Sequence, residues 1–179
     1  MRVSSDLRQA VAIFGAVLIA ALVVGALTEP GVARSGFVGS AAPDVSGVTI
    51  DGTPVSLAGL RGRPVWLTFF SSWCVRCRAE NPDIEAVHRE RSAAGSDLVI
   101  LGIGSGETAA SAAEYARNAR LTFRIAPDPE RATTRRYAVL ALPTHFFIDR
   151  DGVVRDIRIG VLPPELMREL VASIGGGAP

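Results

Sequence analysis

The only two cysteines of the 179-residue chain, Cys74 and Cys77, stand three positions apart in the run WCVRC. Two thiols cannot form the several bridges that staple a small secreted fold, and they leave no third thiol for a cysteine-rich metal site. Because His88 and His145 are the only histidines, a structural zinc site would also lack ligands. No metal is therefore expected, and we interpret the cysteine pair as one functional unit.

This pair lies where a predicted buried strand gives way to a predicted helix. A cysteine at a helix N-terminus faces unpaired amide groups and the positive end of the helix dipole, which favour a thiolate. A spacing of three residues brings the second sulfur onto the same helical face, close enough to form a disulfide. We predict that Cys74 attacks a substrate disulfide and that Cys77 resolves the mixed disulfide. Two buried inert cysteines, or half of a metal site, are the alternatives.

The residues around the pair are candidates for tuning its chemistry. Arg76 places a cation between the cysteines, which should favour the thiolate and make the disulfide more oxidising, unless its side chain only points into water. Val75 fills the other intervening position. Trp73 is expected either to shield the disulfide at the edge of a substrate groove or to pack in the core.

The rest of the chain predicts one α/β domain. An Asp-Gly turn at 51–52 favours a hairpin, continuous apolar runs indicate buried strands, and Pro163-Pro164 opens a final helix. Helices interleaved with a mixed sheet give a three-layer α/β/α sandwich. The predicted strands cover residues 45–50, 53–57, 64–70, 97–103, 144–148 and 153–159, and the predicted helices cover 74–93 (kinked at Pro82), 108–119, 130–137 and 163–174.

Residues 10–27 are all apolar or glycine, which predicts a membrane-spanning anchor at the short end of the usual range. A cleaved signal peptide and a buried helix are the alternatives. Arg2 and Arg8 outweigh Asp6, so residues 1–9 are expected in the cytoplasm and the soluble part after residue 27 outside it. Residues 28–42, rich in small residues and proline, are expected to form a linker to a folded domain at 43–176.

Charge composition argues against a nucleic-acid partner. The 19 basic and 18 acidic side chains nearly cancel, so no excess charge attracts the chain to a polyanion. The length fits one domain plus an appendage.

Three stretches make the chain resemble the thioredoxin superfamily, and within it the TlpA/ResA-like branch of membrane-tethered bacterial thioredoxins. They are APDVSGVTIDGTPVSLAGLRGRPVWLTFFSSWCVRCRAENP, LTFRIAPDPERATTRRYAV and LPTHFFIDRDGVV. The resemblance implies a thioredoxin fold with an N-terminal β-hairpin extension. It also implies that Pro143 is a cis-proline, with Leu142 and Thr144 beside it in the substrate groove, and that Glu80 exchanges protons with Cys77. A solvated glutamate that complements the helix dipole is the alternative for Glu80.

The sequence departs from the pattern of this family at several positions. Thr68 stands where cytoplasmic thioredoxins carry a buried aspartate, which strengthens the case for Glu80. His145 replaces a small or polar residue, and Ala138 and Ala141 replace glycines. These departures bear on substrate preference.

The resemblance implies dithiol/disulfide exchange with protein cysteines outside the cytoplasm, without a cofactor. It further implies a reducing role in cytochrome c or oxidase assembly, with electrons supplied by a membrane thiol carrier. Two alternatives remain. One is a thioredoxin-like copper-binding protein that uses both cysteines and His145. The other is a peroxiredoxin-like thiol peroxidase, for which Ser71 fits the catalytic loop but Leu67 replaces the required proline.

Overall fold

The computed structural model of the chain describes residues 36–175. The predicted anchor at 10–27, the cytoplasmic segment at 1–9 and most of the predicted linker lie outside these residues. Within 36–175, no helix is both long and apolar enough to cross a membrane.

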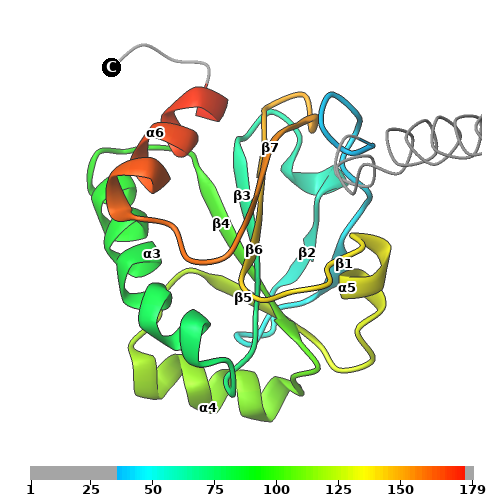
Figure 1. Cartoon of the computed structure of the whole chain (residues 1–179), viewed down its shortest axis with the longest axis vertical. Helices are drawn as coiled ribbons and strands as arrows, with labels where there is room; N and C mark the ends of the chain where they lie inside the picture. The colour runs from blue at the N-terminus through cyan, green and yellow to red at the C-terminus, as the bar shows by residue number, and fades with distance from the viewer. Residues whose placement is uncertain (1–35, 176–179) are drawn as a thin grey trace, which may run out of the picture. The chain divides into compact units, whose positions relative to one another are not determined.

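A five-stranded mixed sheet forms the centre of the domain, with strand order β5-β4-β3-β6-β7 (Figure 1). The middle strand β3 (Val65–Phe70) is parallel to β4 (Val99–Ser105), which is parallel to β5 (Arg124–Asp128). On its other side β3 is antiparallel to β6 (Thr144–Ile148), which pairs with β7 (Val154–Ile159). Every residue of β3, β4 and β6 is buried, as expected of strands covered on both faces.

Three helices cover one face of the sheet: α3 (Val75–Ala93), α4 (Ala109–Ala119) and α6 (Pro164–Gly175). Side chains alternate along a strand, so Trp66 and Phe70 of β3 point to this face and pack with Cys77 and Ile84 of α3. Thr68 lies between them on the same side. The cysteine-bearing helix is therefore held against the central strand by a mainly apolar core.

The second face is covered mainly by non-helical segments. The hairpin of β1 (Ser46–Val48) and β2 (Pro54–Ser56), the 3-10 turn η1 (Ala58–Leu60) and the short helix α5 (Ala132–Arg136) pack over Leu67 and Phe69. Residues 37–42, which we assigned to the linker, also belong to this layer. Phe37 stacks on Tyr137 with ring centroids 6.0 Å apart, and the Gly39 N–H donates to the Val154 carbonyl at 2.8 Å. This packing places the start of the folded unit at Phe37.

Most predicted elements are confirmed with ends that differ by one or two residues, but one strand was missed. No strand was predicted over residues 124–128, whereas they form the edge strand β5. Pro127 and an exposed Arg124 weaken its strand pattern, and an edge position tolerates a proline that cannot complete the ladder. The α5 helix is also shorter than predicted.

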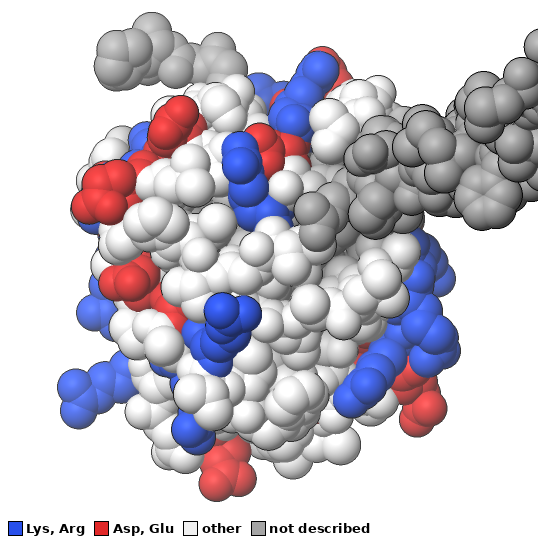
Figure 2. All heavy atoms as spheres, in the orientation of Figure 1, with Lys and Arg blue, Asp and Glu red and all other residues white. Residues whose placement is uncertain are grey.

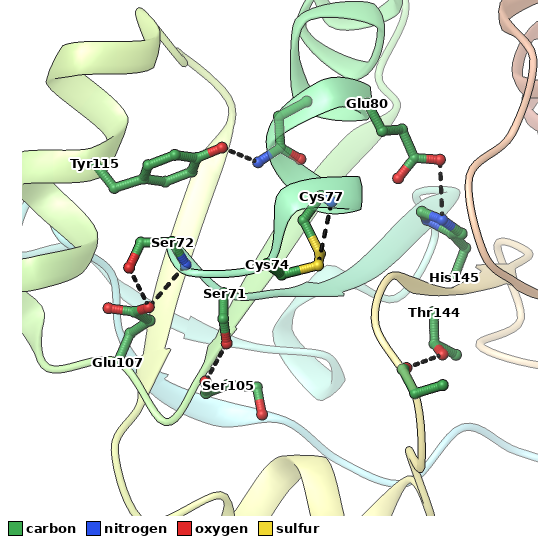
Figure 3. The surroundings of a disulfide bond; sticks show 12 residues. Ser71, Ser72, Cys74, Cys77, Glu80, Ser105, Glu107, Tyr115, Thr144 and His145 are labelled. Atoms are coloured by element: carbon green, nitrogen blue, oxygen red, sulfur yellow. Dashed lines mark hydrogen bonds and ion pairs between the residues drawn. A yellow bond between two sulfur atoms is a disulfide. The ribbon is translucent and has the colours of Figure 1, made fainter.

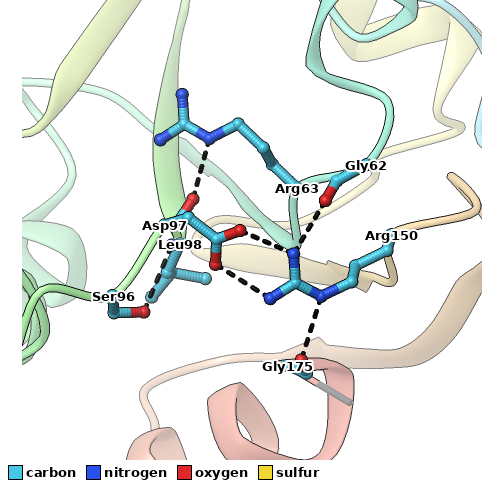
Figure 4. Close-up of polar contacts among 7 residues, drawn as sticks. All are labelled: Gly62, Arg63, Ser96, Asp97, Leu98, Arg150 and Gly175. Carbon is cyan, nitrogen blue, oxygen red and sulfur yellow. Dashed lines mark hydrogen bonds and ion pairs between the residues drawn. The ribbon is translucent and has the colours of Figure 1, made fainter. Parts of the chain in front are cut away.

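A polar cluster closes the end of the sheet where β3 and β4 begin and β6 ends (Figure 4). The Arg150 guanidinium binds both carboxylate oxygens of Asp97, with contacts of 2.5 and 3.0 Å, and donates to the carbonyls of Gly62 and Gly175. This ion pair lowers the pKa of Asp97. Both side chains are nearly half exposed, so the cluster contributes modestly to stability. The cysteines lie at the opposite end of β3.

Candidate active site

Cys74 and Cys77 are joined by a disulfide at the first turn of α3, with Cα atoms 5.3 Å apart. Cys74 is the N-cap of the helix, and its sulfur accepts the backbone N–H of Cys77 at 3.2 Å. The same amide would stabilise a thiolate at this position in the reduced protein. Cys74 is 7% exposed and Cys77 is fully buried. The geometry supports Cys74 as the attacking thiol and Cys77 as the resolving one.

Glu107, in the loop between β4 and α4, holds the loop before Cys74 in place. It was not among the residues predicted for the site. One carboxylate oxygen accepts the backbone N–H of Ser72 at 2.8 Å and its hydroxyl at 2.7 Å, and the other accepts the Ser111 hydroxyl at 2.5 Å (Figure 3). Burial alone would raise the pKa of Glu107, but the hydrogen bonds from Ser111 and Ser72 outweigh it, so the pKa lies below 4.5. Glu107 therefore anchors the active-site loop as a carboxylate.

We expect Glu107→Gln to lower the free energy of unfolding by about 1–3 kcal/mol near neutral pH, because hydrogen bonds to a charged acceptor are lost. A depressed folded-state pKa means that this stabilisation is complete above the ordinary value of 4.5 and disappears as the pH falls through the lowered value. The difference between wild type and variant should therefore shrink on acidification. Denaturant titrations across this range measure it, with exposed Glu130→Gln as the control. A difference that does not change with pH would contradict the assignment.

An open groove runs beside Cys74, and two of the four residues predicted to form it, Trp73 and Leu142, line it, whereas Pro143 and Thr144 do not. The Leu142–Pro143 peptide bond is cis, as predicted. Thr144 is buried instead of lining the groove, and its hydroxyl donates to the Ala141 carbonyl at 2.7 Å, which braces the loop. The residues that line the groove are Trp73, Cys74, Ser105, Arg131, Thr134, Val139, Leu140, Ala141 and Leu142.

Apolar side chains are exposed around the disulfide. Trp73 is 64% exposed, so it lies over the groove and does not pack in the core. Val75, Leu140, Ile159 and Val161 are also exposed. Figure 2 shows uncharged surface across the middle of the face that Figure 1 presents, where the β7–α6 loop runs. Such a surface fits a protein partner.

Arg76 is exposed and forms no ion pair with any residue in 36–175. Its charge near Cys74 should stabilise the thiolate, so we expect Arg76→Pro to lower the reduction potential by about 10–20 mV. Redox titration against glutathione measures the shift. Arg76→Gln removes the charge without the proline and serves as the matched control. A wild-type potential equal to or below that of both variants would contradict this role.

Glu80 is fully buried, so the alternative of a solvated glutamate is wrong. It lies one turn beyond Cys77 on α3. Its Oε1 atom accepts the backbone N–H of Leu162 at 2.7 Å and lies 3.3 Å from Nε2 of His145. A buried carboxylate one turn from the resolving thiol can accept or return its proton.

Three of the polar side chains beneath the disulfide are fully buried: Thr68, Glu80 and His145. Thr68 and His145 are cross-strand partners on β3 and β6. The Thr68 hydroxyl and the Oε2 atom of Glu80 have no hydrogen-bond partner within the described part of the chain. The contacts of His145 with Thr68 and Glu80 were not predicted from the sequence, because they depend on the pairing of β3 with β6.

The geometry bears on both alternatives to dithiol exchange. Nδ1 of His145 accepts the indole N–H of Trp66, and no three His, Cys, Asp or Glu side chains within 36–175 are grouped to hold a metal ion. For a thiol peroxidase, Ser71 should face the reactive cysteine, but its hydroxyl donates to the Ser105 carbonyl at 2.5 Å. Leu67, which stands where a thiol peroxidase would carry a proline, packs in the core on the second face of the sheet.

A thioredoxin-type sheet with a helix-capping cysteine, a buried partner cysteine three residues on and an adjacent cis-proline defines a thiol-disulfide oxidoreductase. The comparisons agree. Residues 38–157 match the model of the AhpC/TSA family, and the chain belongs to this thioredoxin-like family.

Individual relatives and one solved structure are similar to the chain over about three quarters of its length. The chain is 32% identical to thiol-disulfide oxidoreductase ResA of Geobacillus thermodenitrificans over 76% of this chain and 78% of the relative. It is 29% identical to thioredoxin-like protein YneN of Bacillus subtilis, over 73% and 76% of the two chains. A crystal structure of a candidate thiol:disulfide interchange protein DsbE from Chlorobium tepidum matches with a TM-score of 0.71 and 28% identity, covering 78% of this chain and 98% of that one. The chain is thus a ResA-like enzyme that exchanges disulfides with protein thiols.

Proposed function

We propose that this oxidoreductase reduces protein disulfides outside the cytoplasm, in cytochrome c or oxidase assembly. The observation that carries the exchange activity is the position of Cys74, which is 7% exposed beside an open groove, next to a fully buried Cys77. This arrangement lets a client protein reach the first sulfur only, so the second is kept for release of the client.

The location is proposed from the N-terminal sequence. The apolar run at 10–27 would anchor the chain in a bacterial cell membrane, and Arg2 and Arg8 favour retention of the N-terminus in the cytoplasm. A reporter fused to the C-terminus, active only outside the cytoplasm, tests this orientation. Activity of a cytoplasmic reporter at the same position would overturn it.

The reducing direction rests on the resemblance to TlpA/ResA-like proteins. Two electrons would pass from a membrane dithiol carrier to the Cys74–Cys77 disulfide and then to a client disulfide, with both exchanges proceeding through mixed disulfides. No cofactor is needed for either step. The exposed apolar side chains around the groove would contact the client.

Trapping in cells tests the function. A Cys77→Ser chain should accumulate a mixed disulfide through Cys74, because the resolving thiol is absent. Mass spectrometry of the trapped adduct identifies the client, and a Cys74→Ser chain is the matched control. Capture of extracytoplasmic apocytochrome or oxidase-assembly proteins would support the proposal. Capture of cytoplasmic clients only, or a chain that is fully oxidised in growing cells, would contradict it.

A further inference from the structure

His145 is fully buried and contacts Glu80 of α3 and Trp66 of β3. It follows the Pro143-Thr144 pair on β6, opposite Thr68 of β3. Its Nδ1 atom accepts the indole N–H of Trp66 at 3.3 Å, and its Nε2 atom lies 3.3 Å from Oε1 of Glu80. Neither the attack by Cys74, the resolution by Cys77 nor the proton exchange by Glu80 gives this imidazole a role.

The contact with Trp66 fixes where the imidazole proton sits. An indole N–H can only donate, so Nδ1 of His145 must present its lone pair. The single proton of a neutral imidazole is then on Nε2, which faces Glu80. A second proton on Nδ1 would bring two N–H groups together and break the contact with Trp66. Nε2 of His145 therefore carries an N–H directed at the Glu80 carboxylate.

This donor acts on a carboxylate that is already held on one side. Oε1 of Glu80 accepts the Leu162 N–H, while Oε2 has no partner within residues 36–175. In Figure 3 the carboxylate lies between the His145 ring and the turn of α3 that carries Cys77. The Leu162 N–H holds Oε1 in place, and Oε2 stays available to a thiol proton. In this disulfide form the Nε2 contact is within reach but is not aligned as a full hydrogen bond.

The titratable groups nearest to this carboxylate are the two thiols and His145. On β7, Arg158 is the cross-strand partner of His145, and its guanidinium pairs with Asp156 at 2.7 Å. From β3 the site is faced by Trp66 and Thr68, and from the β7–α6 loop by a backbone N–H. The charged residues of α6 stay toward solvent: Glu165 and Glu169 are exposed, and Arg168 pairs with Glu90 of α3 at 2.8 Å.

We propose that His145 is a positioning residue that orients Glu80 as the base for Cys77. Glu80 takes the proton of the Cys77 thiol, and the thiolate attacks the Cys74 sulfur of the mixed disulfide. A Cys74–Cys77 bond forms, the bond to the client sulfur breaks, and the client leaves as a thiolate that takes up a proton from water. The inference rests on the exchange activity but not on the cellular location or the client.

The first test measures the rate of the resolving step against pH, with a mixed disulfide between Cys74 and a chromophoric aromatic thiol. We expect His145→Leu, which lacks the donor, to move the acid limb of the profile upward by about one to two pH units. His145→Gln keeps an N–H donor and should move it by less than about half of that shift. In a Glu80→Gln background, His145→Leu should produce no further shift.

The outcomes separate positioning from a merely structural role. An unchanged profile in His145→Leu, or an equal shift in the Glu80→Gln background, would overturn the proposal. If His145→Leu does not fold, long-range nitrogen NMR of the wild-type protein decides instead. We expect the Nε2–H tautomer of His145, with Nδ1 accepting the indole N–H of Trp66, whereas an Nδ1–H tautomer would overturn the proposal. Failure of wild type to exchange disulfides at all would count against the assigned activity, not against the tautomer.

Discussion

Cys74→Ser is expected to reduce disulfide exchange to the rate of the uncatalysed reaction, while Cys77→Ser retains the first attack and stops at the mixed disulfide. The difference follows from position. Cys74 caps the helix, receives the Cys77 amide and touches solvent, whereas Cys77 is fully buried and can only attack a sulfur already bound at Cys74. Stopped-flow reaction of each reduced variant with an aromatic disulfide measures the first attack and the release separately.

This experiment has an internal control because the chain contains only two cysteines. Each single variant has one thiol, so every adduct is assigned without mapping. Intact mass spectrometry should show a stable adduct on Cys77→Ser and little or none on Cys74→Ser. Equal adduct formation on both variants, or undiminished turnover by Cys74→Ser, would contradict the assigned order of attack.

The elements that position the cysteines were predictable because their signals are local. The run at 64–70 is apolar except for Thr68, and the helix begins beside the first cysteine, so β3 and α3 were placed within a residue. The edge strand β5 was missed because Pro127 and exposed Arg124 break its pattern, and its strand character depends on pairing with β4. Residues 37–42 were assigned to the linker for a similar reason, since Phe37 is held by rings far along the chain.

The same difference between local signals and long-range contacts separates the predicted residues of the active site from the missed ones. Cys74, Cys77 and the cis form of Pro143 were predicted from short motifs. The residues that support them were not predicted, because their contacts span long sequence distances. Glu107 lies 35 residues from Ser72, and Leu162 lies 82 residues from Glu80. The register of β3 against β6 likewise brings Thr68 and His145 together on the face under α3, and no local sequence pattern fixes that register.

Glu80→Gln is expected to slow the resolving step by about 10²-fold at a pH where the Cys77 thiol is protonated, and to have little effect where it is already ionised. Glutamine has nearly the same volume and keeps an oxygen that can accept the Leu162 N–H at the position of Oε1. It cannot take up a proton. The loss should therefore be in proton transfer and not in packing, and stopped-flow rates across the pH range measure it.

The matched control for this change is Glu85→Gln on the same helix. Glu85 is also buried, at 6% exposed, but it binds Thr122 and Arg89 on the side of α3 toward α4 and β5 and contacts neither cysteine. Its substitution should lower stability while leaving the pH profile of the exchange in place, because the hydrogen bonds it loses support the fold only. If Glu80→Gln behaves like this control, with both thiol titrations and the resolving rate unchanged, then Glu80 is a structural residue. A rate loss confined to the acid limb in Glu80→Gln alone would identify the carboxylate as the group that exchanges the proton of Cys77.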